Sequence, residues 1–281
     1  MTRGSGNDTL FDAVVSNRFI SAYFPSGGGG SPPGQAVQPK VLLAHWEADT
    51  PGTIDTDNTL GIPVVTAWRD KIHGYTLKAN TVTQAPFWVV ESNMASKRPV
   101  LAFDGLDDYL ETFDLSLLLN NLSGVSVSLL VSNSKPAVNT VERMVWVESG
   151  LASIPRFGYA RSGIGSDEFY SDGVTRDSDA YIPVTGSVYP YDGFATHTVR
   201  RDYLLGTERV DFNGGLKAFG SSIISQNYSD STPSIRLRIG MEDGGRNPSQ
   251  MALYGIKLYT YAISDDEMTN DAIYFGGLIN A

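Results

Sequence analysis

The chain has 281 residues, of which 41% are apolar and 19% charged, so it is long and apolar enough for one large β domain or two smaller ones. Its net charge of −10 argues against a nucleic-acid partner, because phosphate contacts require clustered Lys and Arg. The absence of cysteine excludes disulfides and thiolate chemistry, and no apolar run reaches the roughly 18 residues of a membrane span.

Residues 1–40 differ in composition from the rest of the chain. Scattered apolar side chains are followed by a Gly- and Pro-rich run, residues 25–34, which cannot pack a core and predicts a linker. Two interpretations are open, a disordered tail or an arm that docks on another subunit. We expect an anchoring arm whose apolar residues are buried against the partner: Leu10, Phe11, Val14, Val15, Phe19, Ile20, Tyr23 and Phe24.

From residue 41 onward the sequence predicts strands separated by Gly, Asn, Asp and Pro turns. The cleanest alternation is residues 235–239, where we expect apolar side chains to face the core and arginines to face outward. The last strand, residues 252–261, is long and rich in aromatic residues. Other strands are predicted over residues 41–46, 125–131, 141–147, 195–200 and 209–212.

One helix is predicted after the last strand. Ser264 and Glu267 form a capping box, in which each side chain bonds the backbone N–H of the other residue. An apolar stripe then continues to Phe275, and Gly276-Gly277 is expected to end the helix.

Seven segments of the chain form an ordered set. In chain order they are Trp68-Arg69-Asp70 with Gly74, residues 99–110, Thr196-His197-Thr198-Val199, Asp211-Phe212-Asn213-Gly214, residues 237–240, residues 253–259, and residues 261–267. This set resembles the concanavalin A-like (laminin G-like) family. The resemblance implies an all-β fold, a two-sheet antiparallel jelly-roll sandwich over residues 41–281, and it points to binding and adhesion more readily than to catalysis.

Catalytic residues do not follow the pattern of glycosidases with this fold. The resemblance implies two carboxylates on one strand, spaced as Glu-x-Asp-x-x-Glu, as nucleophile and acid. Glu47-Ala48-Asp49 begins this pattern, but Gly52 stands where the second Glu is required. A polysaccharide lyase would need His, Tyr, Arg and Gln in the groove, and the spacing of His197 and Tyr203 does not select them. We therefore expect that the protein is not an enzyme.

The richest carboxylate cluster is Asp104, Asp107 and Asp108. Because jelly-roll lectins and laminin G-like domains often hold calcium in loops, the resemblance makes these three residues candidate calcium ligands. The alternative is turn chemistry, since Asp-Gly is a turn signal and Asp108 would be a solvated residue before a strand. Asp211 and Asn213 are a weaker pair, because Asn-Gly suits a hairpin turn by itself. No cofactor other than calcium is expected.

Aromatic side chains give a candidate glycan-binding or partner-binding loop. Sugar binding uses exposed rings, whereas the four tryptophans are expected in the core because Trp is highly buried on average. The long segment from Tyr181 onward lies between strands and is nearly uncharged, which favours a binding loop. The alternative is packing on the body or on a neighbouring subunit. Its aromatic residues are Tyr181, Tyr189, Tyr191 and Phe194.

Together these features predict a non-enzymatic virion component, such as a decoration, fibre or tail protein of a tailed phage. Residues 1–40 would anchor it to other subunits in an oligomeric assembly, and residues 41–281 would display a lectin-like domain on the particle exterior that binds host or environmental glycans. Two alternatives stay open. One is a free carbohydrate-binding module, and the other is a polysaccharide-degrading enzyme.

Overall fold

The computed structural model describes residues 39–90, 97–120, 122–132, 141–149, 154–162, 168–172, 193–220, 235–241 and 247–280. All of them belong to one unit of the chain, Val37–Ala281. The predicted anchoring arm, its apolar residues and the boundary at residue 40 are therefore not tested, because residues 1–38 lie outside the described part.

The described residues form strands, one 3-10 turn and one helix. In chain order these are β1 (Leu42–Glu47), β2 (Ile54–Asp57), β3 (Val64–Arg69), β4 (Thr76–Lys78), η1 (Val82–Gln84), β5 (Phe87–Val90), β6 (Pro99–Asp104), β7 (Leu110–Thr112), β8 (Gly124–Ser132), β9 (Val141–Ser149), β10 (Ile154–Ser162), β11 (Glu168–Asp172), β12 (Phe194–Asp202), β13 (Thr207–Phe212), β14 (Gly215–Gly220), β15 (Ile235–Ile239), β16 (Gln250–Tyr259) and α2 (Asp265–Asn280).

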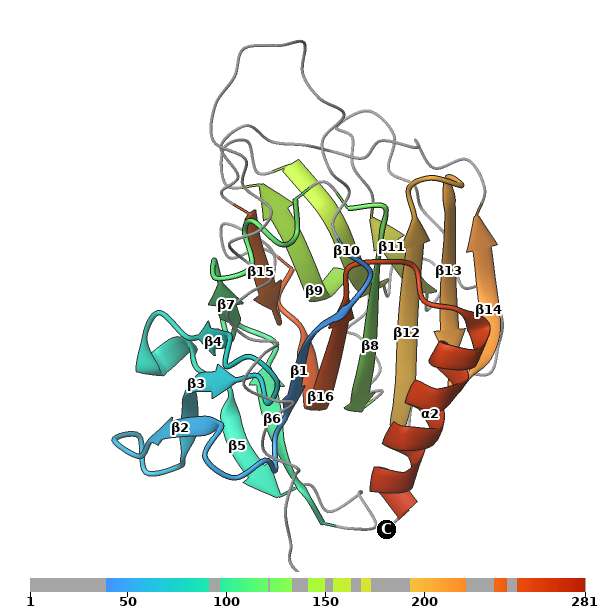
Figure 1. The fold of residues 1–281 in the computed structure, drawn as a ribbon. Coiled ribbons are helices and arrows are strands. Elements are labelled where there is room, and N and C mark those ends of the chain that lie inside the picture. Colours follow the sequence, from blue (N-terminus) through green and yellow to red (C-terminus); the bar gives the residue numbers. More distant parts are fainter. Residues whose placement is uncertain are drawn as a thin grey trace, which may run out of the picture. The chain divides into compact units, whose positions relative to one another are not determined.

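These strands pair antiparallel in one continuous hydrogen-bonded path that curls into a sandwich (Figure 1). One part of the path is β6-β16-β8-β12-β13-β14, with β1 added beside β16, and the other is β11-β10-β9-β15-β7. Strands β4, β3 and β5 connect the two parts. The predicted all-β jelly-roll sandwich with a short C-terminal helix is confirmed, with the refinement that the two layers share one curled sheet.

The core lies between the two layers because each strand alternates its side chains. In β15, Ile235, Leu237 and Ile239 are buried in the core, as the alternation predicts. In β12, Val199 joins the same core. Nδ1 of His197 and the Tyr159 hydroxyl of β10 share a hydrogen bond of 2.9 Å. Each layer therefore has a second, outer face. Many charged side chains lie there, whereas the Arg201–Glu208 ion pair (2.7 Å) is fully buried.

The Trp68-Arg69-Asp70 segment fixes a turn at the edge of the core. Trp68 is fully buried, whereas the buried Asp70 carboxylate accepts backbone N–H groups of Ile72 (2.8 Å), His73 (3.1 Å) and Tyr75 (2.8 Å). One acidic side chain thereby satisfies backbone donors that the turn would otherwise leave unpaired. This geometry explains why the motif marks the fold. Of the four tryptophans, Trp46, Trp68 and Trp146 are buried as expected, and Trp88 is half-buried.

The capping box of α2 is confirmed. The Ser264 N–H donates to the Glu267 carboxylate (2.8 Å), and the Glu267 N–H donates to the Ser264 hydroxyl (3.2 Å). The predicted end at Gly276-Gly277 is wrong, because the helix continues to Asn280. Leu278 and Ile279 pack with Phe275 against an apolar cluster of the sheet, and this burial offsets the low helix propensity of the two glycines. No helix in the described ranges has the length and apolarity that a membrane span requires.

Candidate functional site

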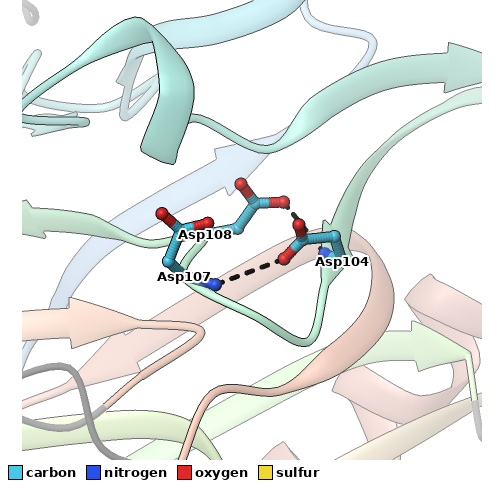
Figure 2. A group of neighbouring side chains, drawn as sticks. All are labelled: Asp104, Asp107 and Asp108. Carbon is cyan, nitrogen blue, oxygen red and sulfur yellow. Dashed lines mark hydrogen bonds between the residues drawn. The ribbon is translucent and has the colours of Figure 1, made fainter.

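The turn between β6 and β7 brings the three predicted calcium ligands together (Figure 2). Carboxylate oxygens of Asp104, Asp107 and Asp108 lie within 4.8 Å of one another. The Asp104 carboxylate accepts the Leu106 N–H (2.7 Å), and the Asp108 carboxylate accepts the Asp104 N–H (2.9 Å). Gly105 has a φ of +79°, which a glycine adopts without strain.

Asp108 is buried, with 3% of its surface exposed, so the alternative interpretation of a solvated residue is wrong. Burial and the nearby charges of Asp104 and Asp107 raise the pKa of Asp108 to about 7. No described cation forms an ion pair with the three aspartates. Hard carboxylate oxygens are the ligand type that calcium prefers, and a bound divalent cation would offset their repulsion. The residues fit calcium in ligand type, with further ligands needed from water or backbone.

The second, weaker pair of candidate calcium ligands, Asp211 and Asn213, makes contacts within the domain. Asp211 is fully buried and bonds Arg200 (3.0 Å), while the Asn213 side chain accepts the Thr196 N–H (2.9 Å). Asn213 and Gly214 have φ values of +48° and +79°, which a tight hairpin turn requires. These residues therefore build the hairpin.

Most of the predicted aromatic loop lies outside the described residues, including Tyr181, Tyr189 and Tyr191. Phe194 is described and begins β12. It is half-buried and packs against the cluster that contains Leu130 and Phe275. For this residue the structure shows packing on the body of the domain.

Two of the residues weighed for catalysis, Glu47 and His197, are buried and make contacts within the domain. Burial raises the pKa of Glu47, but hydrogen bonds with His45, Lys71 and Tyr274 outweigh it and lower that pKa to about 2. His197 is fully buried and faces Tyr159 across the core, so it does not line a surface groove. Neither group is placed to meet a polymer.

Helix α2 covers the outer face of β12 and β8 through charged groups (Figure 1). The buried Asp271 carboxylate accepts hydrogen bonds from Lys257 (2.6 Å), Ser128 (2.7 Å) and the Tyr259 hydroxyl (2.9 Å). Near the helix start, Arg200 bonds Asp265 (2.6 Å). We call this set the ionic seam: His45, Glu47, Lys71, Ser128, Arg200, Asp211, Lys257, Tyr259, Asp265, Asp271 and Tyr274.

The outer face of β7 and β15 carries a different group, in which an aromatic ring is exposed. Phe113, directly after β7, is 49% exposed, and the Arg236 guanidinium lies 5.5 Å from its ring centroid. The Glu111 carboxylate accepts hydrogen bonds from Arg236 (3.2 Å), Arg238 (2.6 Å) and Asn80 (3.2 Å). Arg236 is thus held in place beside the ring. We call Phe113, Glu111, Arg236, Arg238 and Asn80 the Phe113 platform.

Phe113 differs from the other most exposed aromatic residue of the described chain. Tyr274 is 38% exposed, but its hydroxyl bonds Glu47 and Lys71, and Lys257 lies 4.2 Å from its ring centroid. Tyr274 therefore holds α2 in place. The sequence did not single out Phe113. The alternation in residues 235–239 places the arginines on an outer face, but the pairing of β15 with β7 is a contact between distant segments.

The comparisons with known proteins bear on the fold. No protein-family model and no curated protein matches the chain. Among solved structures, the Trypanosoma rangeli sialidase in complex with a difluoro-nononic acid has a TM-score of 0.58 and 13% identity, over 96% of this chain and 38% of that chain. The botulinum neurotoxin type C structure has a TM-score of 0.49 and 14% identity, over 85% of this chain and 51% of that one.

A third structure, the heptameric SAP-like pentraxin from Limulus polyphemus, has a TM-score of 0.45 and 14% identity, over 61% of this chain and 80% of that one. The chain spans well under half the length of the sialidase. At this identity the likeness to the sialidase shows a shared fold and leaves the function to be argued from the site.

Proposed function

We propose that the domain binds carbohydrate at the Phe113 platform and does not cleave it. The observation that carries this proposal is the half-exposed ring of Phe113 beside a guanidinium that Glu111 holds in place. An exposed ring offers a flat apolar surface for the C–H face of a sugar, and fixed polar groups beside it supply hydrogen bonds to hydroxyl groups. A fixed guanidinium also loses little conformational entropy when a ligand binds.

A role without catalysis is supported by the state of the nearby carboxylates. Glycoside hydrolysis needs a protonated acid and a second carboxylate that both reach the substrate. Asp108 has a pKa of about 7, as a general acid would, but it is buried. On the platform, Glu111 is bonded to two arginines, so it serves as an ion-paired hydrogen-bond acceptor.

We also propose that residues 1–40 attach this domain to a larger assembly, such as a virion. The order of an apolar segment, a Gly- and Pro-rich linker and a binding domain supports it. The test is light scattering of the full chain and of a chain that begins at residue 39. Attachment predicts self-assembly or particle binding by the full chain only, and equal behaviour of the two chains would contradict it.

A glycan array tests the binding proposal directly. The wild-type chain is expected to bind at least one glycan, and Phe113→Ala to bind it roughly tenfold more weakly, because the apolar stacking surface is lost. Leu205→Ala is the matched control, since Leu205 is 74% exposed but lies in the turn between β12 and β13. No binding above background would contradict the function, and unchanged binding by Phe113→Ala would contradict the site.

The non-enzymatic part has its own measurement. The glycan bound best on the array is incubated with the wild-type chain, and its products are examined by mass spectrometry. We expect the glycan to stay intact. Cleavage that Glu111→Gln or Asp108→Asn abolishes would show that the domain is an enzyme.

A further inference from the structure

We infer that the C-terminal half of α2 is an acid-sensitive clasp, which His45 releases from the sheet when it gains a proton. His45 lies on β1, is buried, and contacts the helix through two aromatic rings. Its ring centroid lies 5.6 Å from that of Tyr274 and 6.3 Å from that of Phe275, both with edge-to-face geometry. The inference concerns the ionic seam and does not depend on carbohydrate binding.

The charged groups around His45 come from every element packed against it. Glu47 follows on β1, with its carboxylate 2.8 Å from Nε2 of His45. Lys257 stands opposite His45 in the register of β1 and β16, and Lys71 lies in the turn after β3. From α2, Tyr274 donates its hydroxyl hydrogen bond to Glu47.

The neutral form of His45 suits this setting. Burial lowers the pKa of His45 below its usual value, and the positive charges of Lys71 and Lys257 lower it further, whereas Glu47 opposes the shift. Glu47 is already shared, because its carboxylate also bonds Lys71 (2.7 Å) and Tyr274. A proton on His45 therefore adds a cation beside Lys71 and Lys257, whose charges are already balanced by Glu47 and Asp271.

The sign of the pH effect follows from this shift. When α2 is undocked and His45 meets water, its pKa returns toward 6.5, so protons bind the undocked state more tightly. Docking is favoured above about pH 7 and weakens as the pH falls through 6.5. Glu47, with a pKa of about 2, keeps its charge across this window.

Release would uncover an apolar patch on the sheet. Phe275 packs with Leu278 and Ile279 on a cluster that contains Val100 and Leu130. Gly255 makes room for this docking, because a Cβ there would lie 3.2 Å from the Phe275 ring. This patch is a cluster separate from the main core between the layers, so exposing it leaves the contacts of that core in place.

Hydrogen exchange measured by mass spectrometry on the full chain tests the clasp. After correction for intrinsic rates, peptides covering residues 270–280 are expected to open more often at pH 5.5 than at pH 7.5, by up to about tenfold, the limit for one group with an exposed pKa of 6.5, while peptides covering β15 keep their protection. His45→Gln, which stays neutral, is expected to lose this pH dependence. His73→Gln is the matched control, since His73 lies in the turn after β3 and bonds the Leu43 carbonyl (3.0 Å).

A second variant keeps the test decisive if His45→Gln folds poorly. Lys71→Met removes one cation beside His45, so the ratio of opening at pH 5.5 to opening at pH 7.5 is expected to fall, while the lost bond to Tyr274 loosens the helix at both pH values. The clasp is contradicted if residues 270–280 exchange equally at both pH values, if His45→Gln opens like the wild type, or if His73→Gln alone removes the effect.

Discussion

The two outer faces of the sandwich use charged side chains in opposite ways. Between α2 and the sheet, the carboxylates of Glu47 on β1 and of Asp271 on α2 are each buried and bonded to a lysine. On β7 and β15, Glu111 also holds cations, but the nearby ring of Phe113 stays half exposed. The difference indicates that the first face is built for cohesion and the second for contact with a ligand. Variants should therefore separate stability from binding.

The largest effect on stability is expected in the ionic seam. Asp271→Ala leaves the buried Lys257 without its carboxylate partner, which costs about 3–5 kcal/mol of unfolding free energy. Urea denaturation measures this loss, and glycan binding by the folded fraction is expected to be unchanged. Asp55→Ala is the control, because its ion pair with Arg69 is exposed and is expected to contribute little to stability. Equal losses of unfolding free energy in Asp271→Ala and Asp55→Ala would show that the ionic seam contributes no more to stability than an exposed ion pair.

Substitution of Glu111 should change both stability and glycan binding, whereas substitution of Phe113 should change binding alone. Glu111→Gln weakens the hydrogen bonds to Arg236 and Arg238, and we expect a loss of about 2 kcal/mol in unfolding free energy together with weaker glycan binding. Phe113→Ala should reduce binding alone. Thermal melting and calorimetric titration on both variants measure the split. A Glu111→Gln chain that loses stability but binds the glycan normally would show that Arg236 does not contribute to binding.

The turn of Asp104, Asp107 and Asp108 should make stability depend on pH in the sense opposite to that expected for the ionic seam. The pKa of Asp108 is about 7 in the folded chain, against 3.8 ordinarily, so folding favours its protonated form. Its stabilising contribution is present at acid pH and is lost as the pH rises through 7. Asp108→Asn is expected to remove this slope and to gain on the order of 1–2 kcal/mol at pH 8. A wild-type profile that does not fall between pH 5 and 8 would contradict this.

Calcium is expected to have the smallest effect. If the turn of Asp104, Asp107 and Asp108 binds the ion, millimolar calcium should raise the melting temperature by roughly 2–4 °C for each kcal/mol of binding linkage. Chelation should reverse the rise, and Asp104→Asn should abolish it. An identical response to magnesium, or the same response in Asp104→Asn, would show that the turn is only structural.

The fold was predictable because its signals are local. The alternation in residues 235–239, the Asp70 turn and the Ser264 capping box each specify their own backbone, and the order of such segments indicates the sandwich. The Phe113 platform was not predictable, because Arg236 reaches Glu111 only through the pairing of β15 with β7. The burial of Asp108 and the seam under α2 likewise depend on packing between distant segments.

If carbohydrate stacks on the ring of Phe113, the surroundings of that ring must change when the ligand binds. The most direct measurement is fluorine NMR of the chain labelled with fluorophenylalanine, with the Phe113 signal assigned from Phe113→Leu, during titration with the best glycan from the array. Binding on the Phe113 platform predicts that the Phe113 signal shifts with the binding isotherm, while that of the buried Phe275 stays in place. Saturable binding that leaves the Phe113 signal unmoved would contradict it.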